Sequence, residues 1–150
     1  MNLIKKLSTY LIAFSLIFLA ACNFSSRTKI ETDDLRAICK NNLEIAGKQY
    51  KYMASLLQEE QFPRSFENDQ IITSGSDWWC SGFYPGTLWY LYEQTGDSVL
   101  LHEVLQIQEY LSKEQFNRST HDLGFMMFCS FGNAYRITGD EKYKIECLNC

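Results

Sequence analysis

Apolar residues recur with a helical period along most of the chain. Thr32 can cap a helix, and Asp33 and Asp34 then place negative charge in the first turn, where the helix dipole favours it. Pro63 closes this first helical segment, and the polar residues 64–76 separate it from the next helix. Within the first helical segment, apolar residues recur at steps of three, four or seven: Leu35, Ile38, Cys39, Ala46, Tyr50, Met53 and Leu57.

Four further helices are expected after residue 76. The first runs from about Tyr84 to Thr95 and ends at Gly96, with a proline in its first turn, where a missing N–H costs little. The second is capped by Asp97 or Ser98. The third covers about 123–138 and ends at Gly139, and a fourth starts after it with Asp140. No segment gives a convincing strand, so the predicted fold class is all-α. In the second of these helices, one face is expected to contain Leu101, Val104, Leu105 and Leu111.

The chain contains an internal repeat. The pattern Tyr-x-x-Thr-Gly-Asp occurs at residues 92–97 and again at 135–140. A Gly-Phe pair, at 82–83 and at 124–125, opens the apolar helix that leads into each copy. The unit is therefore a helical hairpin, which cannot bury its apolar face alone and stacks on neighbours into a solenoid or a ring. The chain holds too few hairpins to close a ring.

The repeat also predicts where a site lies, because equivalent loops project from the same end of an array. The loop before the first Gly-Phe pair holds Asp77, Trp78 and Trp79, and the loop before the second holds His121 and Asp122. Both loops should share one rim at the N-terminal ends of the apolar helices, which favour anionic groups. Aromatic faces with a carboxylate suit an acidic sugar. Taken singly, the carboxylate could be a helix cap, the tryptophans core residues and the histidine a surface residue.

The N-terminus has the pattern of a secretory signal. Residues 1–6 are short and basic, residues 11–19 are almost entirely apolar but too few to span a bilayer, and Leu-Ala-Ala precedes Cys22. This resembles a bacterial lipoprotein signal, which implies a signal peptide over 1–21, lipidation of Cys22, a tether over 22–29 and a folded part over 30–150. The expected location is the periplasmic membrane face or the surface of a bacterium. A plain signal peptide with an incidental cysteine is the alternative.

The amino-acid composition excludes several kinds of partner and site. The 150 residues are 46% hydrophobic, 21% charged and 15% aromatic, as in a globular domain rich in rings. The formal net charge is −4 and no basic run exists, which argues against nucleic acid as a partner. The cysteines after Cys22 are odd in number and irregularly spaced. We therefore expect buried free thiols and no disulfide framework, metal site or other cofactor.

Two segments carry a family resemblance. Residues 77–86 read Asp-Trp-Trp-Cys-Ser-Gly-Phe-Tyr-Pro-Gly and are followed by Leu88-Trp89 and the first Thr-Gly-Asp turn. Residues 121–125 read His-Asp-Leu-Gly-Phe. Together they resemble the unsaturated glucuronyl hydrolases of glycoside hydrolase family 88, over about residues 32–144. The resemblance implies that 30–150 form the N-terminal part of a six-hairpin (α/α) toroid, incomplete in this chain.

The resemblance also implies an activity. The family removes a Δ4,5-unsaturated uronic acid from the non-reducing end of oligosaccharides left by polysaccharide lyases, glycosaminoglycans among them, by hydrating a vinyl ether. Asp122 matches an aspartate of the family's site, His121 matches a residue that lines the sugar site, and Trp79, with Trp78 beside it, matches a stacking wall. The family's general acid is a second aspartate, whose segment would fall beyond Cys150.

Three readings of function stay open. The chain is expected to be a truncated and inactive fragment of such a hydrolase, with marginal stability and an exposed apolar edge. An alternative is a membrane-tethered helical-repeat protein that binds an acidic glycan without catalysis. The unsaturated rhamnogalacturonyl hydrolases share the toroid and form a third possibility.

Overall fold

The computed structural model describes residues 32–150 of the chain. Residues Ala37–Cys150 form one compact unit, which contains the hairpins and the candidate site. The predicted signal peptide over 1–21, lipidated Cys22 and tether over 22–29 lie outside the described residues. Within those residues, no helix has the length and apolar character needed to cross a membrane.

The described residues are mostly helical, which confirms the predicted fold class in its main feature. Helices were expected at about 84–95 and 123–138, and another was expected to start at residue 97 or 98. The observed helices agree with these bounds to within a residue or two. The elements in chain order are α2 (Thr32–Ala54), β1 (Phe62–Glu67), β2 (Gln70–Ser74), α3 (Phe83–Thr95), α4 (Ser98–Leu111), η1 (Ser112–Phe116), η2 (Gly124–Gly132), α5 (Asn133–Thr138) and α6 (Glu141–Leu148).

The expectation of no strand was wrong. The polar segment after α2 forms an antiparallel β-hairpin, in which Phe62 pairs with Ser74 and Glu67 with Gln70. The two-residue connection Asn68-Asp69 has φ of 48° and 61°, the left-handed conformation that hairpin turns require and that these two residue types tolerate. The register shifts at Arg64, which forms a bulge between the paired residues on either side of it.

The inward face of α4 also differs from the expectation. Leu105 is 43% exposed, and Leu101 is only partly buried. Val104 and Leu111 are buried as expected, whereas Leu100 and Ile107 are buried in place of Leu101 and Leu105. The buried stripe therefore consists of Leu100, Val104, Ile107 and Leu111. This stripe and Trp89 of α3 belong to the same core, and the Trp89 indole donates a 2.7 Å hydrogen bond to Gln108 of α4.

The α2 helix is buried only toward its C-terminal end. Ala46, Tyr50 and Met53 pack against the core, as the periodicity predicted. Ile38 and Cys39, which the same pattern placed on the buried face, are exposed.

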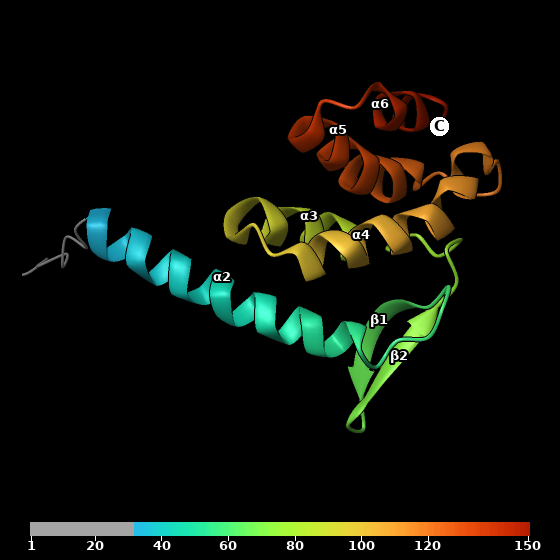
Figure 1. Cartoon of the computed structure of the whole chain (residues 1–150). Coiled ribbons are helices and arrows are strands. Elements are labelled where there is room, and N and C mark those ends of the chain that lie inside the picture. The colour runs from blue at the N-terminus through green and yellow to red at the C-terminus, as the bar shows by residue number, and fades with distance from the viewer. Residues whose placement is uncertain (1–31) are drawn as a thin grey trace, which may run out of the picture. The chain divides into compact units, whose positions relative to one another are not determined.

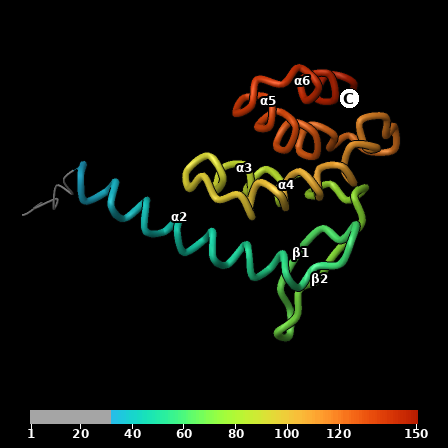
Figure 2. The backbone as a smooth tube through the Cα atoms, viewed as in Figure 1, coloured from blue at the N-terminus to red at the C-terminus, as the bar shows by residue number. Residues whose placement is uncertain are grey.

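The repeat is confirmed as two helical hairpins with the same connection. One is α3 followed by α4; the other is η2 continuing into α5 and then α6, and Figure 2 shows the backbone reversing direction after α3 and after α5. Gly96 and Gly139 end the first helix of each hairpin with φ of 66° and 71°. The second helices are capped by Asp97 and Asp140, whose carboxylates each accept a backbone hydrogen bond at 2.9 Å. The second hairpin departs from regularity in one respect, because η2 is a π-helix.

Equivalent positions of the two copies contact each other. Glu93 of the first copy and Arg136 of the second occupy the same place in the repeat, and they form a bidentate ion pair with distances of 2.7 and 2.9 Å. This pair holds the pKa of Glu93 below its usual value, chiefly through the hydrogen bond. The hairpins therefore stack in register.

The apolar edge expected of an incomplete array is present. Phe128 of η2 and Leu148 of α6 are 69% and 73% exposed. They line a cavity of about 440 Å³ together with Tyr90 and Tyr135. Side chains of this size normally lie inside a protein or at an interface.

The contribution of the Lys51–Asp97 ion pair to stability can be separated from that of helix capping, because Asp140 caps its helix in the same way as Asp97. Asp97 also accepts a hydrogen bond from Lys51, which lowers the pKa of its carboxyl group. Replacing Asp97 by Asn keeps a good cap and removes the charge. We expect the free energy of unfolding of the full-length protein to fall by about 0.2–1 kcal/mol near pH 7.

Asp140→Asn is the matched control, and it should change stability less because, within residues 32–150, the cap is the one hydrogen bond that its carboxylate accepts. A lowered acid pKa adds stability above the pKa of the unfolded state, near pH 4, and this stability is lost as the pH falls through the folded value. The difference between the two variants in denaturant unfolding should therefore shrink below about pH 4. Equal effects at pH 7 would contradict the role given to Lys51.

Candidate functional site

The loops that precede α3 and η2 lie at one end of the two hairpins because these helices touch through their backbones. A Cβ atom at Gly82 would fall closer to the carbonyl oxygens of Phe125 and Met126 than real Cβ atoms come. One turn later, a Cβ at Gly86 would lie 2.6 Å from the carbonyl oxygen of Cys129. Only glycine permits this approach. The structure thus brings together the tryptophan loop and the loop that carries His121 and Asp122.

Three half-exposed aromatic rings form the centre of this rim. The ring centroid of Trp79 lies 5.7 Å from Phe83 and 6.2 Å from Phe125, and those two phenylalanines lie 5.9 Å apart. All three pairs are edge-to-face, a favourable geometry that fixes the ring planes. Trp79 is 43% exposed, so it is not simply a core residue. The two phenylalanines are those of the repeated Gly-Phe pairs.

Asp122 lies at the start of the second inner helix, three residues before Phe125. Its backbone carbonyl accepts hydrogen bonds from Phe125 and Met126 at 2.9 and 3.3 Å, and this begins the helical path. Within residues 32–150, no hydrogen bond to its carboxylate is found, so the carboxylate does not act as a cap. The side chain is 26% exposed, and His121 Nε2 lies 3.6 Å from its Oδ1. The His121 side chain is 95% exposed.

Trp78 has a different environment from Trp79. The guanidinium carbon of Arg64 lies 4.3 Å from the centroid of the Trp78 ring. One face of this indole is therefore covered by a cation from β1. The sequence placed the two tryptophans together as a stacking wall, but in the described structure only Trp79 belongs to the aromatic cluster.

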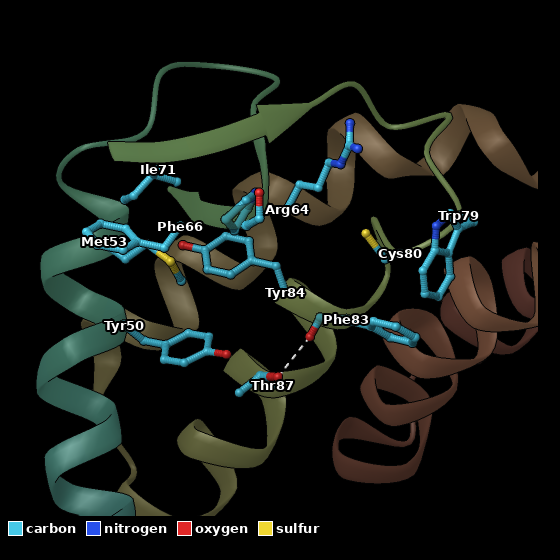
Figure 3. A pocket seen from close by; sticks show the side chains of 12 residues that line it. Tyr50, Met53, Arg64, Phe66, Ile71, Trp79, Cys80, Phe83, Tyr84 and Thr87 are labelled. Carbon is cyan, nitrogen blue, oxygen red and sulfur yellow. Dashed lines mark hydrogen bonds between the residues drawn. The ribbon is translucent and has the colours of Figure 1, made fainter. Parts of the chain in front are cut away.

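A cavity of about 430 Å³ lies between α2, the β-hairpin and the start of α3 (Figure 3). Trp79 and Phe83 line it and are shared with the aromatic cluster, whereas His121 and Asp122 do not line it. Tyr84 lies in its wall, stacked on Tyr50 with centroids 5.9 Å apart. Burial, and a hydrogen bond that the Tyr84 hydroxyl donates to Glu103, raise the pKa of Tyr84.

Glu114 connects the two loops of the rim and was not singled out from the sequence. It is 6% exposed, and its carboxylate accepts a 2.6 Å hydrogen bond from the Ser76 hydroxyl in the tryptophan loop. It also accepts a 2.8 Å bond from the side-chain amide of Asn117, where the second loop begins. The oxygen of that amide accepts from the backbone N–H of Ser119 at 2.8 Å. One buried carboxylate thus holds both loops.

The cysteines of the described chain are free, as expected, but they are not buried thiols. Cys39 and Cys150 are exposed, and Cys80, Cys129 and Cys147 are partly buried. Partial burial raises the pKa of the Cys129 and Cys147 thiols, which disfavours the reactive thiolate. No group of three or more metal-ligating side chains was found within residues 32–150.

Comparison with known proteins supports the family resemblance over part of the chain. No protein-family model matches. An unsaturated glucuronyl hydrolase from Formosa agariphila is 33% identical over 107 residues, which are 65% of this chain and 27% of that protein. An unsaturated chondroitin disaccharide hydrolase from Streptococcus agalactiae is 30% identical over 119 residues, 77% of this chain and 28% of that protein.

A solved structure agrees. The crystal structure of an unsaturated glucuronyl hydrolase specific for heparin matches 73% of this chain with a TM-score of 0.67 and 40% sequence identity, and the match covers 30% of that protein. The chain therefore spans less than a third of the length of each of these relatives.

The described residues form helical hairpins, and the solved structure that they resemble is a helical glucuronyl hydrolase. The chain is homologous to a part of the unsaturated glucuronyl hydrolases.

The glycines of the two Gly-Phe pairs provide a test of the backbone contact. Gly82→Ala forces a methyl group against carbonyl oxygens of η2 and should lower the free energy of unfolding by about 1–3 kcal/mol or more. Gly124→Ala is the matched control, because a Cβ there meets no atom within 4 Å. It should be neutral or slightly stabilising. Thermal unfolding of the two full-length variants measures the difference, and equal losses would contradict the contact.

The bridge made by Glu114 can be tested in the same way. Glu114→Ala leaves the buried Ser76 hydroxyl and the Asn117 amide without their acceptor, and it should cost about 1–3 kcal/mol. Glu109→Ala, at an exposed position of α4, removes the same charge and should change stability by less than about 0.5 kcal/mol. If the two variants unfold at the same denaturant concentration, the carboxylate does not hold the loops.

Proposed function

We propose that the protein carrying these residues is a glycoside hydrolase that acts on oligosaccharides ending in a Δ4,5-unsaturated uronic acid. The proposal rests mainly on one observation: the exposed indole of Trp79 and the partly exposed carboxylate of Asp122, which caps no helix, lie at the same rim. The names of the relatives support the reaction class and the sugar. The C4–C5 double bond flattens that part of the unsaturated uronic acid ring, and the flattened face can stack on Trp79.

The proposed reaction is hydration of a vinyl ether. A carboxylic acid protonates C4 of the unsaturated ring, and positive charge develops at C5 and the ring oxygen. Water adds at C5 and loses a proton, which gives a hemiketal. The hemiketal opens, and the bond to the remaining sugar breaks with release of that sugar.

The described residues supply one side of this site. The Asp122 carboxylate stabilises the developing positive charge and orients the ring, an electrostatic role open to a carboxylate that accepts no hydrogen bond within residues 32–150. His121 lies beside it and is free to contact the sugar. Trp79 forms the wall. The proton donor is a second carboxyl group outside these residues, as the family resemblance implies.

We further propose that residues 32–150 are not active by themselves. The rim is open, and Phe128 and Leu148 leave an apolar edge where further hairpins would pack. The match to less than a third of each relative supports this. Attachment to a bacterial membrane through Cys22 is also a proposal, and Cys22 lies outside the described residues.

The experiment uses the full-length protein, meaning residues 1–150 together with the further hairpins and the second carboxyl group proposed above. It replaces Asp122 by Asn and follows the loss of the double-bond absorbance of an unsaturated uronyl disaccharide. We expect kcat to fall by about 10²–10³-fold, the range for loss of one transition-state electrostatic contact. Asp69→Asn makes the same chemical change in the hairpin turn, where Asn tolerates the positive φ, and should keep the activity of the unmodified protein.

Two outcomes would overturn the assignment. Normal turnover by the Asp122→Asn variant would show that this carboxylate is not part of the reaction. Binding of the disaccharide without any turnover by the unmodified full-length protein would favour a glycan-binding module over an enzyme.

A further inference from the structure

The cavity of about 430 Å³ is not used by the proposed reaction. Its volume lies within the range of about 300–1,000 Å³ in which small ligands bind. Most of its wall is apolar or aromatic and comes from α2, both strands and the first turn of α3: Tyr50, Met53, Phe66, Ile71, Phe83 and Tyr84. Such a wall suits the faces of a ring, and it leaves few groups to hold a charge.

Arg64 is the one residue with a formal charge in this wall. It sits at the bulge of β1, where the strand pairing skips a residue. A bulge redirects a side chain from the ordinary alternation of a strand, and bulges are common beside active sites. In Figure 3, Arg64 comes from the hairpin and Trp79 from the loop before α3, with Cys80 between them.

Arg64 is exposed, and its guanidinium has no carboxylate partner within residues 32–150. Its guanidinium carbon lies 4.3 Å from the centroid of the Trp78 ring, a cation–π contact, and its N–H groups make no hydrogen bond within residues 32–150. None of the ion pairs found within residues 32–150 involves Arg64. In a chain of net charge −4, an unpaired guanidinium at a cavity is a local site for an anion.

We propose that this cavity is an anion subsite in which Arg64 binds a carboxylate or sulfate group of the acidic oligosaccharide whose unsaturated ring stacks on Trp79. This rests on the proposed function. Trp79 and Phe83 line both the cavity and the aromatic cluster, so one ligand can contact both. The two possible sources of the anion are the carboxylate of the unsaturated ring and a sulfate on the neighbouring sugar.

The first test measures KM on the full-length protein with unsulfated and sulfated unsaturated disaccharides. Arg64→Gln should raise KM about tenfold, more than it lowers kcat, because it removes a charge-assisted contact. Arg64→Lys keeps the charge without the planar fork and should fall in between. Lys48→Gln, an exposed charge on α2 outside the cavity, is the matched control and should leave KM unchanged. A rise for both substrates assigns the carboxylate, and a rise for the sulfated one alone assigns the sulfate.

The second test measures binding through tryptophan fluorescence, so it does not depend on turnover. The unmodified protein should bind the disaccharides less tightly as salt increases, and this salt dependence should be weaker in Arg64→Gln. If Arg64→Gln matches Lys48→Gln in both KM and binding while turnover persists, the subsite is wrong and the proposed function stands. If the unmodified protein neither turns over nor binds the disaccharides, both proposals are wrong.

Discussion

The close approach of two helix backbones at Gly82 and Gly86 is the constraint on which the candidate site depends. It packs α3 against η2 at their N-terminal ends. Carbonyl oxygens of η2 occupy the space that a Cβ atom at Gly82 or Gly86 would need. Because the contact is made by backbone, it leaves no freedom for one hairpin to slide along the other. The Glu93–Arg136 pair, near the C-terminal ends of α3 and of α5, which continues η2, keeps the same register. The positions of the loops beyond the helices follow from these two contacts.

The contacts at the starts of α3 and η2 determine which side chains each loop exposes. The Gly-Phe pairs put Phe83 and Phe125 side by side, and Trp79 completes an edge-to-face cluster with them. Glu114 ties the backbone beneath the tryptophans to the start of the second loop. The rim is thus rigid at its base, while its ring faces and the Asp122 carboxylate stay open to solvent. Such an arrangement suits a site that binds a ring without rearranging.

The sequence predicted the features that depend on local signals. Each Thr-Gly-Asp turn contains a left-handed glycine that ends one helix and an aspartate that caps the next. Both turns were therefore found together with the helices beside them. The β-hairpin was missed because its strands are short and its turn is Asn-Asp without a glycine. In α4, two adjacent apolar stripes have the same period, and only contact with α3 selects Leu100 over Leu101. Glu114 was missed because its partner Ser76 is 38 positions away in the chain.

An acidic substrate poses an electrostatic problem at this rim. The proposed reaction places a carboxylate of the enzyme near a sugar that carries its own negative charge, and like charges at short range raise the free energy of binding. The repulsion can be offset only by cations or N–H groups that contact the anionic part of the ligand. The helix N-termini offer N–H groups at the rim, but they face the same region as Asp122. Arg64 lies on β1, in the wall of a cavity that Asp122 does not line, where it would bind the anion without neutralising the Asp122 carboxylate. The β-hairpin that the sequence did not reveal is therefore what would allow one site to attract an acidic sugar and still keep a charged carboxylate beside its reactive carbon.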